Sequence, residues 1–276
     1  MLITRRFVYI HMPKTGGTFV TSVLRHLHAP PAAGGWRRRL RAKARRLLGW
    51  PSTPYGPLED REPKHATCRE VPGYCARLPL VSNVRSPFDW YVSQYEFGWW
   101  KRTFEYHPVT HPTPAGAAIE AALPDFQRSH PHFPDLRFPE FIDLCTQAAG
   151  TLQQAGAPAL GLCTHSFLRY FFRDPAAASR DLTVDHARRG IHRAAMYDVT
   201  LLRAHRLNQD LHRFLLGERY RPDDLEFILH KERVLPMGRG RSDDQPWQAY
   251  YSPDLLHKVR ELDRLMLAMF NRKSVV

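Results

Sequence analysis

Cysteine is scarce in this sequence, and long apolar runs are missing from it. The four cysteines are scattered and show neither a C-x-x-C pair nor the spacing of a zinc finger (Cys68, Cys75, Cys145, Cys163). Both a disulfide framework and a cysteine-based zinc site are therefore disfavoured, and reduced thiols of a cytosolic protein are expected. No stretch reaches the roughly 20 apolar residues that span a bilayer. We expect a soluble, cytoplasmic protein without a signal peptide or a transmembrane segment.

Acidic residues are also few relative to basic ones. The 276 residues include 40 Lys and Arg against 27 Asp and Glu, a formal net charge of +13. Such a surplus indicates an anionic partner, such as a nucleotide, an acidic glycan, nucleic acid or a lipid headgroup. The run from Arg37 to Arg46 holds seven basic residues and no acid. This run is either a solvated basic segment or part of a cationic amphipathic helix that contacts an anionic surface.

Strand and helix patterns alternate along the chain. Short apolar runs at residues 7–12, 80–85 and 198–204 predict buried strands. Helical spacing or capping residues follow each of them, at 16–27, 86–100 and 206–216, and further helices are expected at 138–149 and 252–270. This alternation predicts an α/β fold in which helices flank a central parallel sheet. We expect a single domain over residues 1–276.

Two stretches interrupt this pattern. Residues 29–63 are rich in Pro, Gly and Arg, and residues 101–137 contain six prolines. We expect both to be mostly irregular insertions, and loops of this length in compact domains are often functional. Four histidines of the second stretch suggest a metal cluster, but they lack a partnering acid or cysteine pattern (His107, His111, His130, His132). Acceptor contacts or simple solvation explain them better.

The segment HMPKTGG, residues 11–17, joins the first strand to the first helix. Glycines in such a loop let backbone N–H groups approach an anion, and the following helix N-terminus favours negative charge. In a Walker A loop the lysine follows the last glycine, whereas Lys14 precedes Gly16 and Gly17. The second strand ends in Arg85, where a Walker nucleotidase needs an acid for Mg²⁺. These departures indicate a ligand with two separate phosphate groups and no required metal.

Arg85 and Ser93 provide a place for the second phosphate. Arg85 lies at the start of the predicted helix, and Ser93 comes seven residues after the capping Ser86. Seven residues return to nearly the same helix face, about 10 Å along the axis. A long arginine side chain can fold toward that serine, so both can contact one phosphate.

The motif PKTGGT followed by VRSPFDWYVSQYEF resembles the paired signature of sulfotransferases that use 3′-phosphoadenylyl sulfate (PAPS). Looser similarity in PKHATCREV, DVTLLRAHRLNQDL and YYSPDLLHKV extends it over most of the chain and favours the carbohydrate-type branch. The resemblance implies a P-loop-like three-layer fold. It also implies that Arg85 and Ser93 bind the 3′-phosphate, and that the first motif binds the 5′-phosphosulfate (Lys14, Thr15, Gly16, Gly17, Thr18, Phe19).

Further roles follow from this resemblance. Lys14 neutralises charge on the leaving adenosine 3′,5′-bisphosphate, and no metal is required. His65 is placed as the base for a hydroxyl or amine of a carbohydrate or other metabolite, although Lys64 stands where relatives commonly have glycine. Arg239 and Arg241 resemble a late basic loop over the 3′-phosphate. Nucleic acid is not expected as a partner.

Other interpretations stay open at this point. The chain could be a P-loop nucleotide kinase-like enzyme, which magnesium dependence would distinguish. It could also be a non-enzymatic basic protein that binds nucleic acid or membranes, with steep salt dependence and no nucleotide affinity. Locally, the glycine loop could be a mere turn, and Arg85, Ser93 and His65 could be surface side chains.

Overall fold

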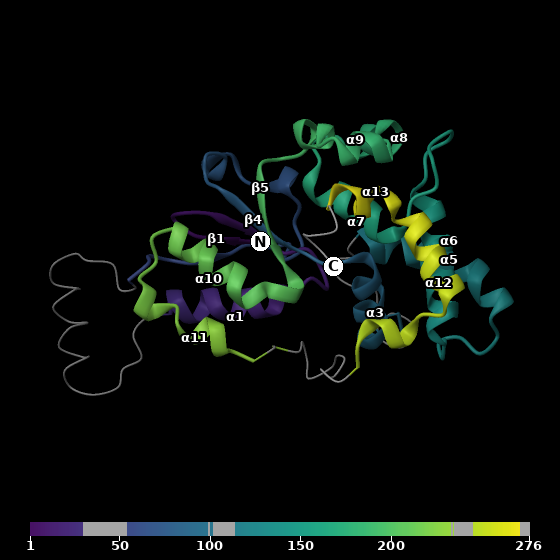
Figure 1. Ribbon diagram of the computed structural model, residues 1–276, viewed down its shortest axis with the longest axis horizontal. Helices are drawn as coiled ribbons and strands as arrows, with labels where there is room; N and C mark the ends of the chain where they lie inside the picture. Colours follow the sequence, from purple (N-terminus) through teal and green to yellow (C-terminus); the bar gives the residue numbers. More distant parts are fainter. Residues whose placement is uncertain (30–53, 99, 102–113, 233, 235–244, 271–276) are drawn as a thin grey trace.

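The computed structural model describes residues 1–29, 54–98, 100–101, 114–232, 234 and 245–270 (Figure 1). A five-stranded sheet lies at its centre with the strand order β3-β1-β2-β4-β5. The strands are β1 (Leu2–Ile3), β2 (Val8–Ile10), β3 (Glu59–Asp60), β4 (Leu80–Val84) and β5 (Val199–Arg203). The predicted α/β class is confirmed, and the three predicted strands are β2, β4 and β5.

The sheet is mixed, so the prediction of a parallel sheet is only partly right. Strands β2, β4 and β5 are parallel, whereas β1 pairs antiparallel with both β2 and β3. A tight turn produces the reversal between β1 and β2, because the Thr4 amide and hydroxyl both donate to the Phe7 carbonyl at 3.0 and 2.9 Å. Strands β1 and β3 have only two residues each, which is too short for an apolar pattern to reveal.

Helices cover both faces of the sheet, and each face has its own hydrophobic core (Figure 1). In β2, Val8 and Ile10 belong to one core and Tyr9 to the other, and all three side chains are fully buried. Burial on both faces explains why this strand reads as a continuous apolar run. The Tyr9 core contains residues of α1 (Gly17–His28), α10 (Leu207–Gly217) and α11 (Phe227–His230).

The opposite core is larger and is built mainly from helices. It contains residues of α3 (Pro87–Phe97), α5 (Pro114–Ser129), α6 (Phe138–Leu152), α7 (Leu162–Phe171), α8 (Pro175–Asp181), α9 (Val184–Arg188), α12 (Pro253–Leu262) and α13 (Arg264–Met269). The sequence pattern did not predict α7, α8 or α9.

Helix α5 corrects the prediction that residues 101–137 are mostly irregular. Its apolar residues recur at helical spacing and are buried (Ala115, Ala118, Ile119, Ala122, Phe126). Packing of this stripe against α6 outweighs the cost of Pro124, which lies inside the helix. Tertiary contacts therefore decide the structure where the proline count indicated a loop.

The prediction of one continuous helix over residues 252–270 is wrong, because the helix breaks at Asp263 into α12 and α13. Asp263 is completely buried, and its carboxylate accepts bonds from the Tyr91 hydroxyl at 2.9 Å and from the Thr164 amide and hydroxyl at 2.8 and 2.7 Å. Burial raises the pKa of Asp263 to about 6. This carboxyl therefore ties α3, α7 and the break in the last helix together.

Candidate functional site

Three loops meet at one edge of the sheet. Because β2, β4 and β5 are parallel neighbours, their carboxyl ends at Ile10, Val84 and Arg203 lie along the same edge. In open α/β sheets, ligands bind outside the carboxyl ends of the strands. The two motifs singled out in the sequence follow directly after β2 and β4, so the fold places both at this edge.

Four consecutive carbonyls of the glycine loop accept hydrogen bonds from side chains. The bonds are Thr15 Oγ1 to Met12 O at 2.8 Å, Trp90 Nε1 to Pro13 O at 3.1 Å, Arg85 Nη1 to Lys14 O at 3.0 Å and Asn83 Nδ2 to Thr15 O at 3.1 Å. Three of the four donors come from β4 and the segment that follows it. The second motif thus fixes the backbone of the first.

The backbone of this loop leaves several amides available to a ligand. Lys14 has φ of 64° and Gly16 has φ of 98°, both left-handed, and Gly16 caps α1 without a side-chain bond. The first amides of a helix have no acceptor inside the helix. Within the described residues, the amides of Gly16, Gly17 and Thr18 donate to no backbone acceptor. A run of such amides in left-handed and helical backbone forms a cradle for an anion.

Glycine is favoured at both loop positions, at Gly17 by steric contact and at Gly16 by its left-handed φ of 98° together with a close contact. A Cβ at Gly17 would overlap the imidazole of His11, and a Cβ at Gly16 would lie 2.5 Å from Leu207 Cδ2. Leu207 begins α10, so the unit after β5 also contacts the loop. Sequence reasoning missed Leu207, Asn83 and Trp90 as supports of the loop, because nothing in their local pattern links them to it.

We predict opposite effects for two glycine-to-alanine substitutions. Gly17→Ala should lower the free energy of unfolding by about 1–3 kcal/mol, since the new methyl must displace the buried His11 ring. Gly150→Ala, on α6, has no atom within 4 Å of the new Cβ and should raise it by about 0.5–1 kcal/mol. Urea unfolding of both variants measures this difference. A Gly17→Ala protein as stable as Gly150→Ala would contradict the packing described.

Helix α3 presents one face to the loop. Trp90 and Phe97 are seven residues apart on this helix, and each contacts the loop, Trp90 through Pro13 O and Phe97 through the ammonium of Lys14. Ser93 lies between them on the same face, by the helical spacing of three and four residues. Arg85 comes just before the helix and is held by Asp89, with Nε 2.7 Å from Oδ2. The structure thus brings Arg85 and the helix face of Ser93 beside the same loop.

Not every residue predicted in the first motif points its polar atoms outward. The Thr15 hydroxyl is fully buried and donates to Met12 O. The Phe19 amide donates to Gly16 O at 3.0 Å, and its ring is buried in the core between α1 and the sheet. Thr18 is half-buried on the first turn of α1. The amides of Gly16, Gly17 and Thr18 are therefore better placed to bind a ligand than the Thr15 hydroxyl or the Phe19 amide.

His65 lies beside the start of the loop. Its Nδ1 is 3.0 Å from the carbonyl oxygen of His11, and the two imidazole rings meet edge to face with centroids 4.8 Å apart. Since a carbonyl only accepts, Nδ1 carries the hydrogen and Nε2 keeps its lone pair. Burial lowers the pKa of His65, and the nearby Lys64 ammonium lowers it further, although the bond to His11 O opposes the shift. His65 is therefore neutral at neutral pH.

His11 is more deeply buried than His65. Burial holds the pKa of His11 well below its usual value, and the neighbouring His65 and Lys64 act in the same direction. Its ring covers Gly17 and contacts His65, so it connects the loop with the segment that carries His65.

Some predicted residues lie outside the described parts of the chain. These are Arg239, Arg241, the basic run from Arg37 to Arg46, and two of the four histidines of the second insertion, His107 and His111. Of the other two histidines, His130 stacks on Phe126 with ring centroids 3.8 Å apart, and His132 Nε2 lies 3.3 Å from Glu140. Within the described residues, no group of three or more His, Cys, Asp or Glu is arranged to hold a metal ion.

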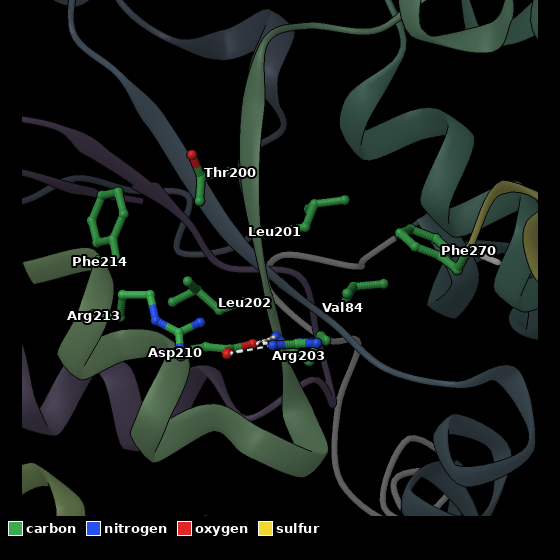
Figure 2. Close-up of a pocket in the computed structure, with 9 residues that line it drawn as sticks. All are labelled: Val84, Thr200, Leu201, Leu202, Arg203, Asp210, Arg213, Phe214 and Phe270. Carbon is green, nitrogen blue, oxygen red and sulfur yellow. Dashed lines mark hydrogen bonds and ion pairs between the residues drawn. The ribbon is translucent and has the colours of Figure 1, made fainter. Parts of the chain in front are cut away.

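A separate pocket of about 380 Å³ lies at the outer edge of β5 (Figure 2). Its lining includes Arg203 and Asp210, whose side chains point toward one another, with Nε–Oδ2 and Nη2–Oδ1 distances of 2.8 Å. Phe214 and Phe270 contribute apolar walls from α10 and from the residue after α13. No residue of the glycine loop lines this pocket.

Comparison with known protein families, with characterised proteins and with solved structures finds no match in any of the three. Among the helices that the structure describes, none combines the length and apolar character needed to cross a membrane.

Proposed function

We propose that this chain is a PAPS-dependent sulfotransferase with a P-loop-like site, which transfers a sulfuryl group to a hydroxyl or amine of a carbohydrate or another metabolite. The observation that carries the proposal is the hydrogen bond from Arg85 Nη1 to Lys14 O. It joins the two motifs, 71 residues apart, at the ends of neighbouring parallel strands. Two anion-binding elements side by side suit a ligand with two separate phosphate groups.

The loop fits the phosphosulfate end of such a ligand. The amides of Gly16, Gly17 and Thr18 donate to no backbone acceptor in the described residues and are therefore available to an anion, and the helix N-terminus adds a favourable dipole. The ammonium of Lys14 offsets negative charge on the bridging oxygen. PAPS itself supplies the activated sulfuryl group, and positioning with electrostatic stabilisation is what the protein contributes.

The 3′-phosphate is assigned to Arg85 and Ser93. Arg85 donates from Nε to Asp89 Oδ2 and from Nη1 to Lys14 O, and these two bonds fix the plane of the guanidinium. The N–H groups that are not used in these two bonds are the ones assigned to the phosphate. Its side chain is 19% exposed, so a phosphate contact there is partly shielded from water and strengthened. A kinase-like site would need a carboxylate for Mg²⁺ at this strand end, and β4 instead leads into Arg85.

His65 is assigned as the base for the acceptor. The bond between Nδ1 and His11 O orients the ring and leaves Nε2 able to take a proton. The exposed Lys64 beside His65 is suited to an acceptor that carries negative charge near its reacting group. We place the reaction in the cytoplasm, and the run from Arg37 to Arg46 remains a candidate contact with an anionic surface.

Ser93→Ala tests the 3′-phosphate assignment with little disturbance to the loop. Removing one hydroxyl donor should weaken binding of adenosine 3′,5′-bisphosphate about three- to tenfold, as expected for a bond of roughly 0.5–1.5 kcal/mol. Binding of adenosine 5′-phosphosulfate, which lacks the 3′-phosphate, should not change. Titration calorimetry measures both, and Ser129→Ala on α5 is the matched control. Equal weakening of both ligands would show that Ser93 does not contact the 3′-phosphate.

The activity is tested with PAPS labelled in its sulfuryl group. The protein is incubated with a panel of glycans and small hydroxylated or amino metabolites, and label in each acceptor is counted. Transfer to at least one acceptor class, dependent on Lys14, is the expected result. Absence of transfer together with absence of bisphosphate binding would overturn the proposal.

A further inference from the structure

We propose that Phe97 is a positioning residue for Lys14, holding its ammonium at the anion site before a ligand arrives; this rests on the proposed function of the site. The Nζ atom of Lys14 lies 3.7 Å from the centroid of the Phe97 ring. An ammonium over an aromatic face within about 6 Å is attracted by the ring quadrupole. Both side chains are half-buried, so water screens this attraction less than at a fully exposed site.

Residues at the two ends of helix α3 contact Lys14. Arg85, just before the helix, donates to the carbonyl of Lys14, and Phe97, its last residue, meets the ammonium. The helix ends there because Gly98 adopts φ of 61° and returns its amide to Gln94 O and Tyr95 O. The position of the ring is therefore set by a defined helix end rather than by a loop.

Contact with the ring lowers the entropic cost of ordering the lysine side chain when an anion binds. Its four-carbon stem is flexible, and ordering it on binding costs conformational entropy. The ring covers one side of the ammonium, and the proposal places the anion on another side. Phe97 thus selects the stem conformation in advance, and the lysine keeps its contact with the ring when the ligand is bound.

A double-mutant cycle separates this role from simple packing. Phe97→Leu keeps the apolar bulk but removes the ring face, and should weaken binding of adenosine 3′,5′-bisphosphate about three- to tenfold. Phe97→Tyr keeps the ring and should bind as the unmutated protein does. In a Lys14→Met background, Phe97→Leu should have no further effect. An equal loss in both backgrounds would overturn the proposal.

NMR of the unmutated protein provides a test that does not depend on any variant folding, and its free-protein spectrum does not depend on the proposed function. The ε-methylene protons of Lys14 should show an upfield ring-current shift in the free protein, and the shift should persist when bisphosphate is added. Absence of the shift, or its disappearance on binding, would overturn the positioning role. If the unmutated protein binds no bisphosphate, the sulfotransferase proposal fails, and the free-protein spectrum alone decides whether Phe97 positions Lys14.

Discussion

Lys14→Met should remove most of the activity and most of the cofactor affinity together. Methionine keeps the length of the stem but cannot neutralise charge on the phosphosulfate. Loss of one preorganised group that stabilises the transition state costs about 10²–10³-fold in kcat. In the proposed site the ammonium also contacts the anion in the ground state, so binding of adenosine 3′,5′-bisphosphate should weaken about tenfold or more.

The matched control for this substitution is Lys258→Met. Lys258 pairs with Asp143 on the surface at 2.5 Å, between α12 and α6, and exposed pairs of this kind contribute little. Its turnover and bisphosphate binding should match those of the unmutated protein. A Lys14→Met enzyme with normal turnover would show that the glycine loop is not where sulfuryl transfer occurs.

His65→Ala should separate turnover from binding. Loss of a positioned base typically lowers the rate about 10²–10⁴-fold, whereas the bisphosphate does not need the imidazole. His257→Ala, an exposed histidine on α12, serves as the control and should be fully active. Turnover close to normal in His65→Ala would transfer the role of base to His11 or to a residue between 101 and 137.

The pH dependence of turnover gives an independent test of His65. Its pKa is lowered from 6.5, chiefly by burial, so the ring is neutral and competent at pH 7 and above. Turnover should therefore stay level near neutrality and fall only as the pH drops below 6.5 toward the lowered pKa. Lys64→Met removes a cation that lowers the pKa of His65 and should move this fall to higher pH. A fall that begins above pH 7 in the unmutated enzyme would contradict the assignment.

The strands and helices around the site could be predicted because their patterns are local. The run Val8–Ile10 is buried on both faces, and Ser86-Pro87 marks the start of α3. Motif spacing also indicated that Arg85 and Ser93 belong near the glycine loop. The two-residue strands β1 and β3 could not be predicted, because they exist only through pairing with neighbours.

What holds the loop together could not be predicted from the sequence. Asn83, Trp90 and Leu207 support the loop through contacts that span 67 or more residues, and none has a local signature. The break at Asp263 depends on Tyr91 and Thr164 in distant helices. The stripe on α5 had a helical period, but the number of prolines around it indicated a loop instead.

Binding of adenosine 3′,5′-bisphosphate without metal tests the central claim most directly. Calorimetry in EDTA should give tighter binding of this ligand than of adenosine 5′-monophosphate, by about tenfold or more for one charge-assisted phosphate contact. Adding Mg²⁺ should leave that affinity unchanged, and ATP should bind more weakly with or without the metal. Binding of ATP as tight as that of the bisphosphate, or a requirement for Mg²⁺, would contradict a site built for two separate phosphate groups.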